Sequence, residues 1–168
     1  SCMSTDPRDK RLRSSLLLEK DDIVLLFDAG PDFRQQMLTQ HVKRLDSIIL
    51  THEHKDHIAG MDDVRAFNYR SNDAIDIYAE ERVQEAIKRE YSYVFSSNNY
   101  PGIPRMRLRT IENSPFTIKG VEIIPVRVMH WNLEIFGFRV GNFAYITDAS
   151  SIPISGIELL KGVEHLVI

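Results

Sequence analysis

The sequence contains a single cysteine, Cys2, in 168 residues, so the chain cannot form an internal disulfide bond. This scarcity favours a reducing, cytoplasmic compartment over a secreted one. No apolar signal-peptide core stands near the start. The longest wholly apolar run, Ile23 to Phe27, is far too short to span a membrane. We therefore expect a cytoplasmic protein with no membrane partner.

An excess of basic residues is also missing. The chain has 21 Lys and Arg against 24 Asp and Glu, which gives a formal net charge of −3. This balance argues against a broad nucleic-acid-binding surface, so a long nucleic acid is not an expected partner. The hydrophobic fraction of 43% and the charged fraction of 27% exclude a disordered or collagen-like chain. The length suits one domain, which we assign to residues 1–168.

Several catalytic signatures are absent as well. The sequence has no G-x-G of a dinucleotide fingerprint and no Gly-Lys-Ser/Thr of a P-loop. It also has no G-x-S-x-G nucleophile elbow. A glycine-rich dinucleotide fingerprint, a P-loop and an elbow-type serine nucleophile are therefore excluded.

Strand and helix signals alternate irregularly along the chain, which predicts a layered α/β domain of the α+β kind. The predicted strands are Leu16 to Glu19, Ile23 to Asp28, Ser47 to Leu50, Ile75 to Tyr78, Met106 to Ile111, Phe116 to Ile118, Val121 to Met129, Glu134 to Val140, Asn142 to Thr147 and Val163 to Ile168. The predicted helices are Asp32 to about His41, Ile58 to Asn68, Glu80 to Val94 and Ile157 to Lys161.

The most informative segment runs from Thr51 to His57, directly after a predicted buried strand. It places three histidines and an aspartate within six residues, namely His52, His54, Asp56 and His57. In a loop at a strand end these side chains can converge, and they offer the nitrogen and oxygen ligands that borderline divalent metals prefer. The spacing differs from the helical zinc-protease motif, which needs two histidines four residues apart. A solvated loop that contains histidines by chance is the alternative.

Two later residues fit the same site because each ends a predicted strand. His130 follows Val121 to Met129, and Asp148 follows Asn142 to Thr147. Strand-end side chains can reach a site at one rim of a sheet. Taken alone, His130 would fit a capping residue and Asp148 the start of a turn.

The histidine segment resembles the H-x-H-x-D-H signature of the metallo-β-lactamase superfamily. Residues 27–32 resemble its D-x-G element, and residues 145–148 resemble its bridging-aspartate strand. Within the superfamily, residues 2–15, 136–139 and 147–150 are most similar to PhnP-type phosphodiesterases. The resemblance implies a metallo-β-lactamase fold, an αββα sandwich of two mixed sheets between helices.

The resemblance also implies two divalent metal ions, for which Zn, Mn and Fe are the candidates. One ion would be held by His52, His54 and His130, the second by Asp56 and His57, and Asp148 would bridge both. Asp56 and Asp148 would be the catalytic residues, because they would position a metal-bridging hydroxide. The implied function is a metal-dependent hydrolase, a phosphodiesterase for small cyclic or nucleotide phosphodiesters.

Other functions stay open at this stage. The same superfamily includes tRNA 3′-processing endonucleases and thioester hydrolases, and a metal-binding domain without turnover is a third alternative. The expected partner is a small phosphodiester substrate, and a homodimer is a further expectation.

The ends of the chain suggest a piece of a longer native domain. The superfamily's last histidine ligand would lie beyond Ile168, and the first strand would precede Cys2. Cys2 matches the last cysteine of a C-x-C-x-x-C cluster found in the PhnP-type subgroup. We therefore expect an incomplete sandwich at both ends, with a structural zinc near Cys2 in the intact protein. An unpaired thiol is the alternative.

Overall fold

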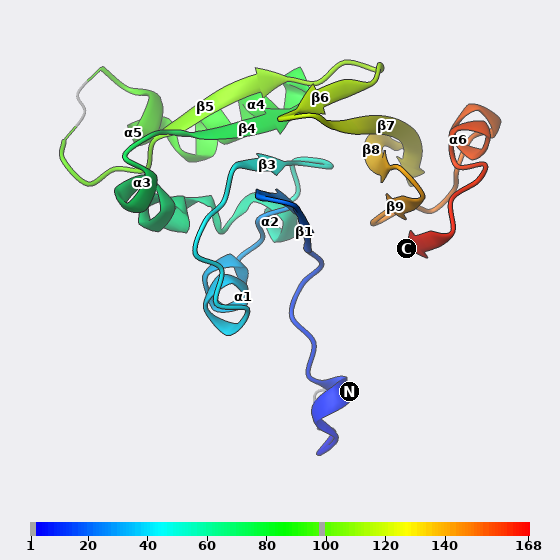
Figure 1. Ribbon diagram of the computed structural model, residues 1–168, viewed down its shortest axis with the longest axis horizontal. Helices are drawn as coiled ribbons and strands as arrows, with labels where there is room; N and C mark the ends of the chain where they lie inside the picture. Colours follow the sequence, from blue (N-terminus) through cyan, green and yellow to red (C-terminus); the bar gives the residue numbers. More distant parts are fainter. Residues whose placement is uncertain (1–2, 98–99) are drawn as a thin grey trace.

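The computed structural model describes residues 3–97 and 100–168 (Figure 1). It contains two five-stranded sheets. The first sheet has the order β1 (Leu16–Lys20), β2 (Ile23–Phe27), β3 (Ser47–Ile49), β4 (Ile75–Ala79) and β5 (Met106–Thr110). The second has the order β10 (His165–Val167), β9 (Phe143–Tyr145), β8 (Leu133–Val140), β7 (Val121–His130) and β6 (Phe116–Ile118).

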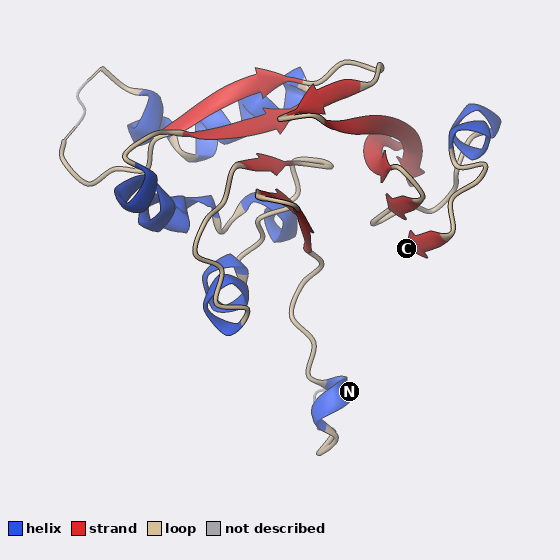
Figure 2. Ribbon diagram, viewed as in Figure 1, coloured by secondary structure: helices blue, strands red, loops and turns tan. Residues whose placement is uncertain are grey.

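Most helices come directly after strands of the first sheet along the chain (Figure 2). They are α1 (Phe33–Thr39), α2 (Lys55–Ile58), the 3-10 turn η2 (Met61–Val64), α3 (Arg65–Ser71), α4 (Glu81–Glu90) and α5 (Ser92–Phe95). The helix α6 (Ile154–Leu159) lies beside the second sheet, while the short turn η1 (Pro7–Asp9) belongs to a segment that extends away from the sheets. Among the described residues, no helix combines the length and the apolar character needed to cross a membrane.

The side chains of β2 alternate between two buried layers. Leu26 belongs to the apolar cluster between the first sheet and the helices, which also contains Phe33 of α1. Leu25 and Phe27 point to the opposite face and join the cluster between the sheets. There the ring centroid of Phe27 lies 5.5 Å from that of Phe138 of β8. This alternation is the period of two expected for a strand buried on both faces.

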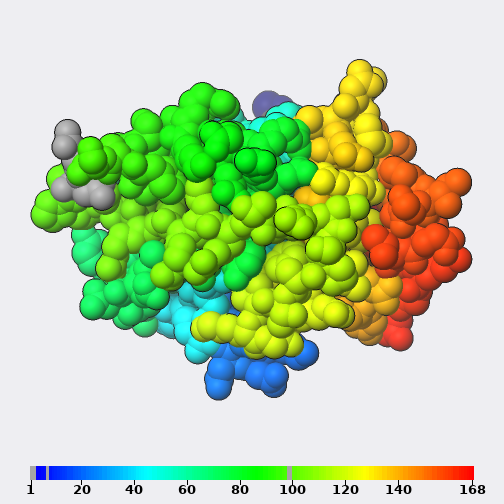
Figure 3. All heavy atoms as spheres, turned by 90° about the horizontal axis from the view of Figure 1, so that it is seen from above, coloured from blue at the N-terminus to red at the C-terminus, as the bar shows by residue number. Residues whose placement is uncertain are grey.

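A third buried cluster lies on the outer face of the second sheet, where Val126, Val128 and Ile135 pack against residues near α6 such as Leu160. Helices, sheet, sheet and helix thus form the αββα sandwich that the family resemblance implies. In the space-filling view the green segments and the yellow to red segments form one continuous surface (Figure 3).

The strand directions decide where polar side chains can gather. β2 pairs in parallel with β3, and β3 pairs in parallel with β4. The carboxyl ends of these strands therefore meet at one edge of the first sheet, the usual place for a ligand site in an α/β sheet. Asp28 follows β2 at this edge, and the histidine segment follows β3.

Two predicted helices are divided in the structure. The predicted helix from Ile58 to Asn68 becomes α2, η2 and α3, and the break falls at Gly60, where a Cβ atom would lie 2.0 Å from the carbonyl oxygen of Gly30. The predicted helix from Glu80 to Val94 divides at Tyr91, which has φ −111° and ψ 39°. Tyr91 donates a hydrogen bond to the Ile58 carbonyl over 2.7 Å, so tertiary contacts override helical periodicity at both breaks.

Candidate metal centre

The histidine segment leaves β3 and turns into a short helix. Leu50 still donates a backbone hydrogen bond to Tyr78 of β4 over 2.9 Å, and the next residues carry the site. His52 and His54 lie in the extended stretch that follows, whereas Asp56 and His57 lie on α2. The prediction of a loop throughout this segment is therefore wrong for its second half.

The structure brings all six predicted ligands together. The ligand atoms of one group lie within 4.8 Å of one another, and so do those of a second group: His52, His54, His130 and Asp148 in the first, Asp56, His57 and Asp148 in the second. Asp148 belongs to both groups. Its Oδ2 atom lies 3.1 Å from Nε2 of His57, 3.6 Å from Nε2 of His52 and 4.0 Å from Nε2 of His130.

Three segments far apart in the sequence contribute to this cluster. His130 is the last residue of β7, so the predicted strand to Met129 is one residue too short. Asp148 lies in the loop after β9, which ends at Tyr145, so the predicted strand to Thr147 is two residues too long. The sheets are joined beside the site, because Phe136 of β8 donates to the Thr51 carbonyl over 3.3 Å.

The contacts of His52 fix its tautomer. Its Nδ1 atom lies 3.0 Å from Oγ1 of Thr51, and this oxygen lies 3.0 Å from both carboxylate oxygens of Asp28. Because a carboxylate only accepts, the Thr51 hydroxyl donates to Asp28 and accepts from Nδ1–H of His52. Nε2 of His52 then carries a lone pair. This atom is buried and has no hydrogen-bond partner among the described residues, so a metal ion would satisfy it.

Burial lowers the pKa of His52 to about 3, and the neighbouring charges of His57 and His54 act in the same direction. His52 is thus neutral at physiological pH, the state in which imidazole binds a metal.

Asp28 supports the second ligand group from behind. Its carboxylate is completely buried and accepts hydrogen bonds from His57 Nδ1 over 2.8 Å, from the Thr51 backbone N–H over 2.9 Å and from the Tyr145 hydroxyl over 3.3 Å. The Nε2 atom of His57 therefore faces Asp148. Such a carboxylate behind a histidine fixes the ring orientation and raises the basicity of the ligand.

Asp28 is not among the predicted site residues. The sequence places it only within residues 27–32, which resemble the D-x-G element of the family. The signal that could have found it is a charged residue directly after the wholly apolar strand Ile23–Phe27, because such a residue is buried only when it is paired.

The pKa values of His57 and Asp148 are shifted in opposite directions. Burial opposes a charge on His57, but its hydrogen bond to Asp28 and the charges of Asp28 and Asp148 raise the pKa of His57 to about 9. Burial likewise opposes the charge on Asp148, yet the charge of His57 and the hydrogen bond from Thr147 hold the pKa of Asp148 below its usual range. The site thus favours an ionised Asp148.

The backbone around the site is unusual. Asp28, Trp131 and Asp148 have positive φ angles of 62°, 55° and 59°. Aspartate tolerates this left-handed conformation, whereas it is a genuine outlier for a bulky residue. Gly30 allows a further close approach, because a Cβ atom there would lie 1.9 Å from the carbonyl oxygen of Asp56. Only glycine lets the loop after β2 pack against α2 in this way.

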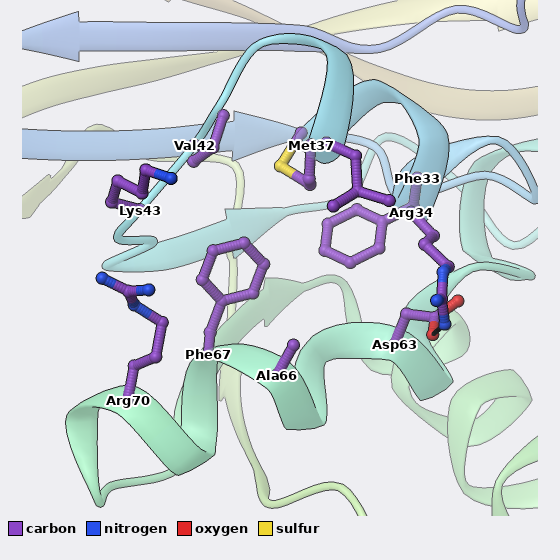
Figure 4. Close-up of a pocket in the computed structure, with 10 residues that line it drawn as sticks. Phe33, Arg34, Met37, Val42, Lys43, Asp63, Ala66, Phe67 and Arg70 are labelled. Atoms are coloured by element: carbon purple, nitrogen blue, oxygen red, sulfur yellow. Dashed lines mark ion pairs between the residues drawn. The ribbon is translucent and has the colours of Figure 1, made fainter.

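A separate hollow of about 310 Å³ lies between α1 and α3 (Figure 4). Its apolar lining includes Phe33 and Phe67, whose ring centroids lie 6.1 Å apart. Arg34 and Asp63 form an ion pair of 3.6 Å among the lining residues. The lining residues include none of the six predicted ligands, so the hollow is distinct from the metal cluster. The predicted zinc ligand Cys2 lies outside the described residues.

Comparisons with known proteins identify the family of this chain. A model of the beta-lactamase superfamily domain matches residues 24–168. An octanoyltransferase of Porphyromonas gingivalis is 40% identical over 99% of this chain and 34% of its own length. A ribonuclease Z of Staphylococcus epidermidis is 25% identical over 94% of this chain and 51% of its own length. The chain thus spans about a third and about half of these two curated relatives.

Solved structures support the same family. A diphosphatase from the PhnP family superposes with a TM-score of 0.89 and 36% identity, over 98% of this chain and 63% of that chain. Human tRNase Z, short form, superposes with a TM-score of 0.67 over 92% of this chain and 69% of that one, and its 22% identity shows the fold alone. The chain therefore belongs to the metallo-β-lactamase superfamily, within which it resembles the PhnP-type proteins.

Proposed function

We propose that the protein is a dinuclear-metal-dependent hydrolase, a phosphodiesterase for small cyclic or nucleotide phosphodiesters. The observation that carries this proposal is the pair of ligand groups that share Asp148. A shared carboxylate between two clusters is the arrangement expected for two metal ions that act on one phosphate group. The likeness to a diphosphatase from the PhnP family supports a substrate with phosphorus at the reacting centre.

The residues fit such ions. His52, with its unpaired buried nitrogen, would hold one ion together with His54 and His130, while Asp56 and His57 would hold the other. Their imidazole and carboxylate donors suit Zn, Mn or Fe. When bound, the ions would polarise phosphoryl oxygens and lower the pKa of a water molecule.

Side chains around the site orient the predicted metal ligands. Thr51 and Asp28 hold the ring protons of His52 and His57 on their Nδ1 atoms, so that both Nε2 atoms face the site. The innermost ligands are shielded from solvent, because the side chains of His52 and His57 are 0% and 2% exposed. Asp148 and Asp56 are 28% and 50% exposed, so they form the wall that a phosphate group can approach. They would orient the attacking water in line with the leaving oxygen.

Two other activities receive specific support from the comparisons. The diphosphatase likeness favours hydrolysis of a phosphoanhydride in a nucleotide as a second candidate, because the charge and the in-line geometry at phosphorus are similar in the two reactions. The similarity to a ribonuclease Z supports RNA processing as a third candidate. The octanoyltransferase match covers 34% of that protein, so its printed activity does not assign acyl transfer to the matched segment.

Metal content is the first expected result. Protein purified without a chelator should contain one to two divalent ions per chain by elemental analysis. His57 must lose a proton before its Nε2 atom can bind an ion, and its pKa of about 9 means that protons compete increasingly as the pH falls below that value. Metal affinity should therefore weaken towards acidic pH, and uptake should release protons. Absence of metal after reconstitution at pH 8 would overturn the assignment of the site.

The activity test compares bond types with the same metal-loaded protein. We expect turnover of bis(p-nitrophenyl) phosphate and of a 2′,3′-cyclic nucleotide in the presence of Mn²⁺ or Zn²⁺. A dinucleotide joined by a diphosphate tests the second candidate, a precursor tRNA tests the third, and an acyl thioester tests the thioesterase alternative. Turnover of the thioester, with bis(p-nitrophenyl) phosphate and the cyclic nucleotide both unhydrolysed, would refute the phosphodiesterase. The assignment of the metal site would stand.

A further inference from the structure

The turn between β7 and β8 places a large aromatic side chain beside the metal cluster. Trp131 is the only tryptophan of the chain and follows His130 directly. Together with His54, His130, Asn132 and Leu133 it lines an open hollow of about 410 Å³. Two of the predicted metal ligands and the indole ring thus share one surface hollow.

The indole contributes nothing to the apolar cores. Trp131 is 82% exposed and belongs to none of the three buried clusters, although its neighbour Leu133 packs against one of them. Tryptophan usually gains stability by burying its large ring. An isolated exposed apolar residue needs no explanation by itself, but the backbone of Trp131 is also unusual.

That backbone is held in an unfavourable conformation. Trp131 has φ 55°, which is uncommon for a bulky side chain, and strained residues of this kind gather at functional sites. Its N–H donates to Oγ of Ser150 over 2.8 Å, and Ser150 in turn donates from Oγ and from N to the Met129 carbonyl over 2.8 Å and 2.7 Å. Ser150 lies two residues after Asp148. The turn that carries the indole is therefore fastened to the loop that carries the shared carboxylate.

We infer that this hollow is the subsite for the base of a nucleotide substrate, with Trp131 as its stacking platform. The inference rests on the proposed phosphodiesterase and names the part of the substrate that lies beyond the reacting phosphate. An indole face stacks on any nucleobase, so the subsite should accept several bases. Asn132 offers a donor and an acceptor to the edge of the base. The short path from Trp131 to His130 lets one nucleotide reach both features.

Binding is measured through the fluorescence of the single tryptophan. Adenosine 3′-monophosphate should quench the emission of the metal-loaded protein in a saturable way, because the adenine stacks on the indole. Glycerol 3-phosphate, which has a phosphate but no base, should leave the emission unchanged. An equal response to both compounds, or no quenching by the nucleotide at millimolar concentration, would overturn the subsite.

Kinetics with substrates that share a reacting ring give an independent test. Trp131→Ala should raise KM for 2′,3′-cyclic AMP by roughly 5- to 100-fold, the effect of losing one stacked base, and leave glycerol 1,2-cyclic phosphate unaffected. Trp131→Phe should retain most of the affinity. Trp131→Gly should show the same loss as alanine with an unchanged or higher unfolding midpoint, since glycine accepts a positive φ.

Tyr69→Ala is the matched control, because Tyr69 is 72% exposed and lines a different hollow on α3. It should bind and hydrolyse both substrates like the wild type. An unchanged KM for cyclic AMP in folded Trp131→Ala would overturn the subsite even where phosphodiesterase activity stands. Nucleotide-specific quenching without turnover of any phosphate substrate would retain the subsite and refute the proposed reaction.

Discussion

Replacing Asp148 by alanine is expected to lower phosphodiesterase turnover by roughly a thousandfold or more. Replacing a residue that only hydrogen-bonds to a metal ligand typically reduces metal affinity or activity by about 10- to 100-fold. Asp148 is itself a predicted ligand, so its loss should cost more. Its Oδ2 atom lies within 4.0 Å of Nε2 of His52, His57 and His130, so the substitution removes a contact common to both ligand groups. Elemental analysis should show a lower metal content, and initial rates with bis(p-nitrophenyl) phosphate should show the loss of turnover.

The control must separate the carboxylate from its backbone conformation. Asp148 has φ 59°, and Asp21, an exposed residue of the β1–β2 turn, has φ 52°. Asp21→Ala thus makes the same change in the same left-handed conformation away from the site, and its activity should equal that of the wild type. Asp148→Asn keeps a residue that tolerates positive φ and should be nearly as inactive as alanine. Full activity in folded Asp148→Asn would refute the role of the charge.

The predicted ligand set depended on patterns that are local in the sequence. His52, His54 and His57 stand out because their spacing is dense and follows a buried strand. His130 and Asp148 were placed by the ends of predicted strands and by resemblance, and only the parallel order of β2, β3 and β4 with the facing second sheet shows why they meet. Such pairing between distant segments has no periodic signal along the chain.

The errors of the sequence prediction have tertiary causes. The break at Gly60 follows from the approach of Gly30, and the break at Tyr91 coincides with its hydrogen bond to Ile58. Neither contact can be predicted from helical periodicity, which favours continuous helices at both places. The role of Asp28 was missed for the same reason, since its partners Thr51 and Tyr145 lie 23 and 117 residues away.

Asp28→Asn is expected to weaken both the fold and the metal site, although no predicted ligand changes. The carboxylate accepts from the Thr51 N–H, the Thr51 hydroxyl, His57 Nδ1 and the Tyr145 hydroxyl, and it is fully buried. An asparagine offers one acceptor oxygen and an NH₂ group that would oppose at least one of these donors. Leaving a buried donor unpaired costs about 1–3 kcal/mol of unfolding free energy. Loss of the carboxylate behind His57 should weaken metal binding by about 10- to 100-fold.

The pH dependence of the metal-free protein distinguishes this electrostatic role from a merely structural one. The folded-state pKa of His57 is raised to about 9, so its protonation stabilises the fold fully below its ordinary pKa of about 6.5. That contribution is lost as the pH rises through 9. Denaturant unfolding of the wild type should therefore show falling stability from pH 6.5 to 9. In Asp28→Asn the decline should be much smaller, because the main interactions that raise this pKa are gone.

Asp46→Asn provides the matched control for this substitution. The Asp46 side chain is only 5% exposed and accepts from the Val24 N–H over 2.8 Å, from Arg44 and from Lys119, so its loss should also lower the free energy of unfolding. It belongs to neither ligand group, and its variant should bind metal with wild-type affinity and keep the decline in stability above pH 6.5. Equal metal affinity in folded Asp28→Asn and Asp46→Asn would show that Asp28 serves packing alone. A selective loss in Asp28→Asn would place the carboxylate in the alignment of His57.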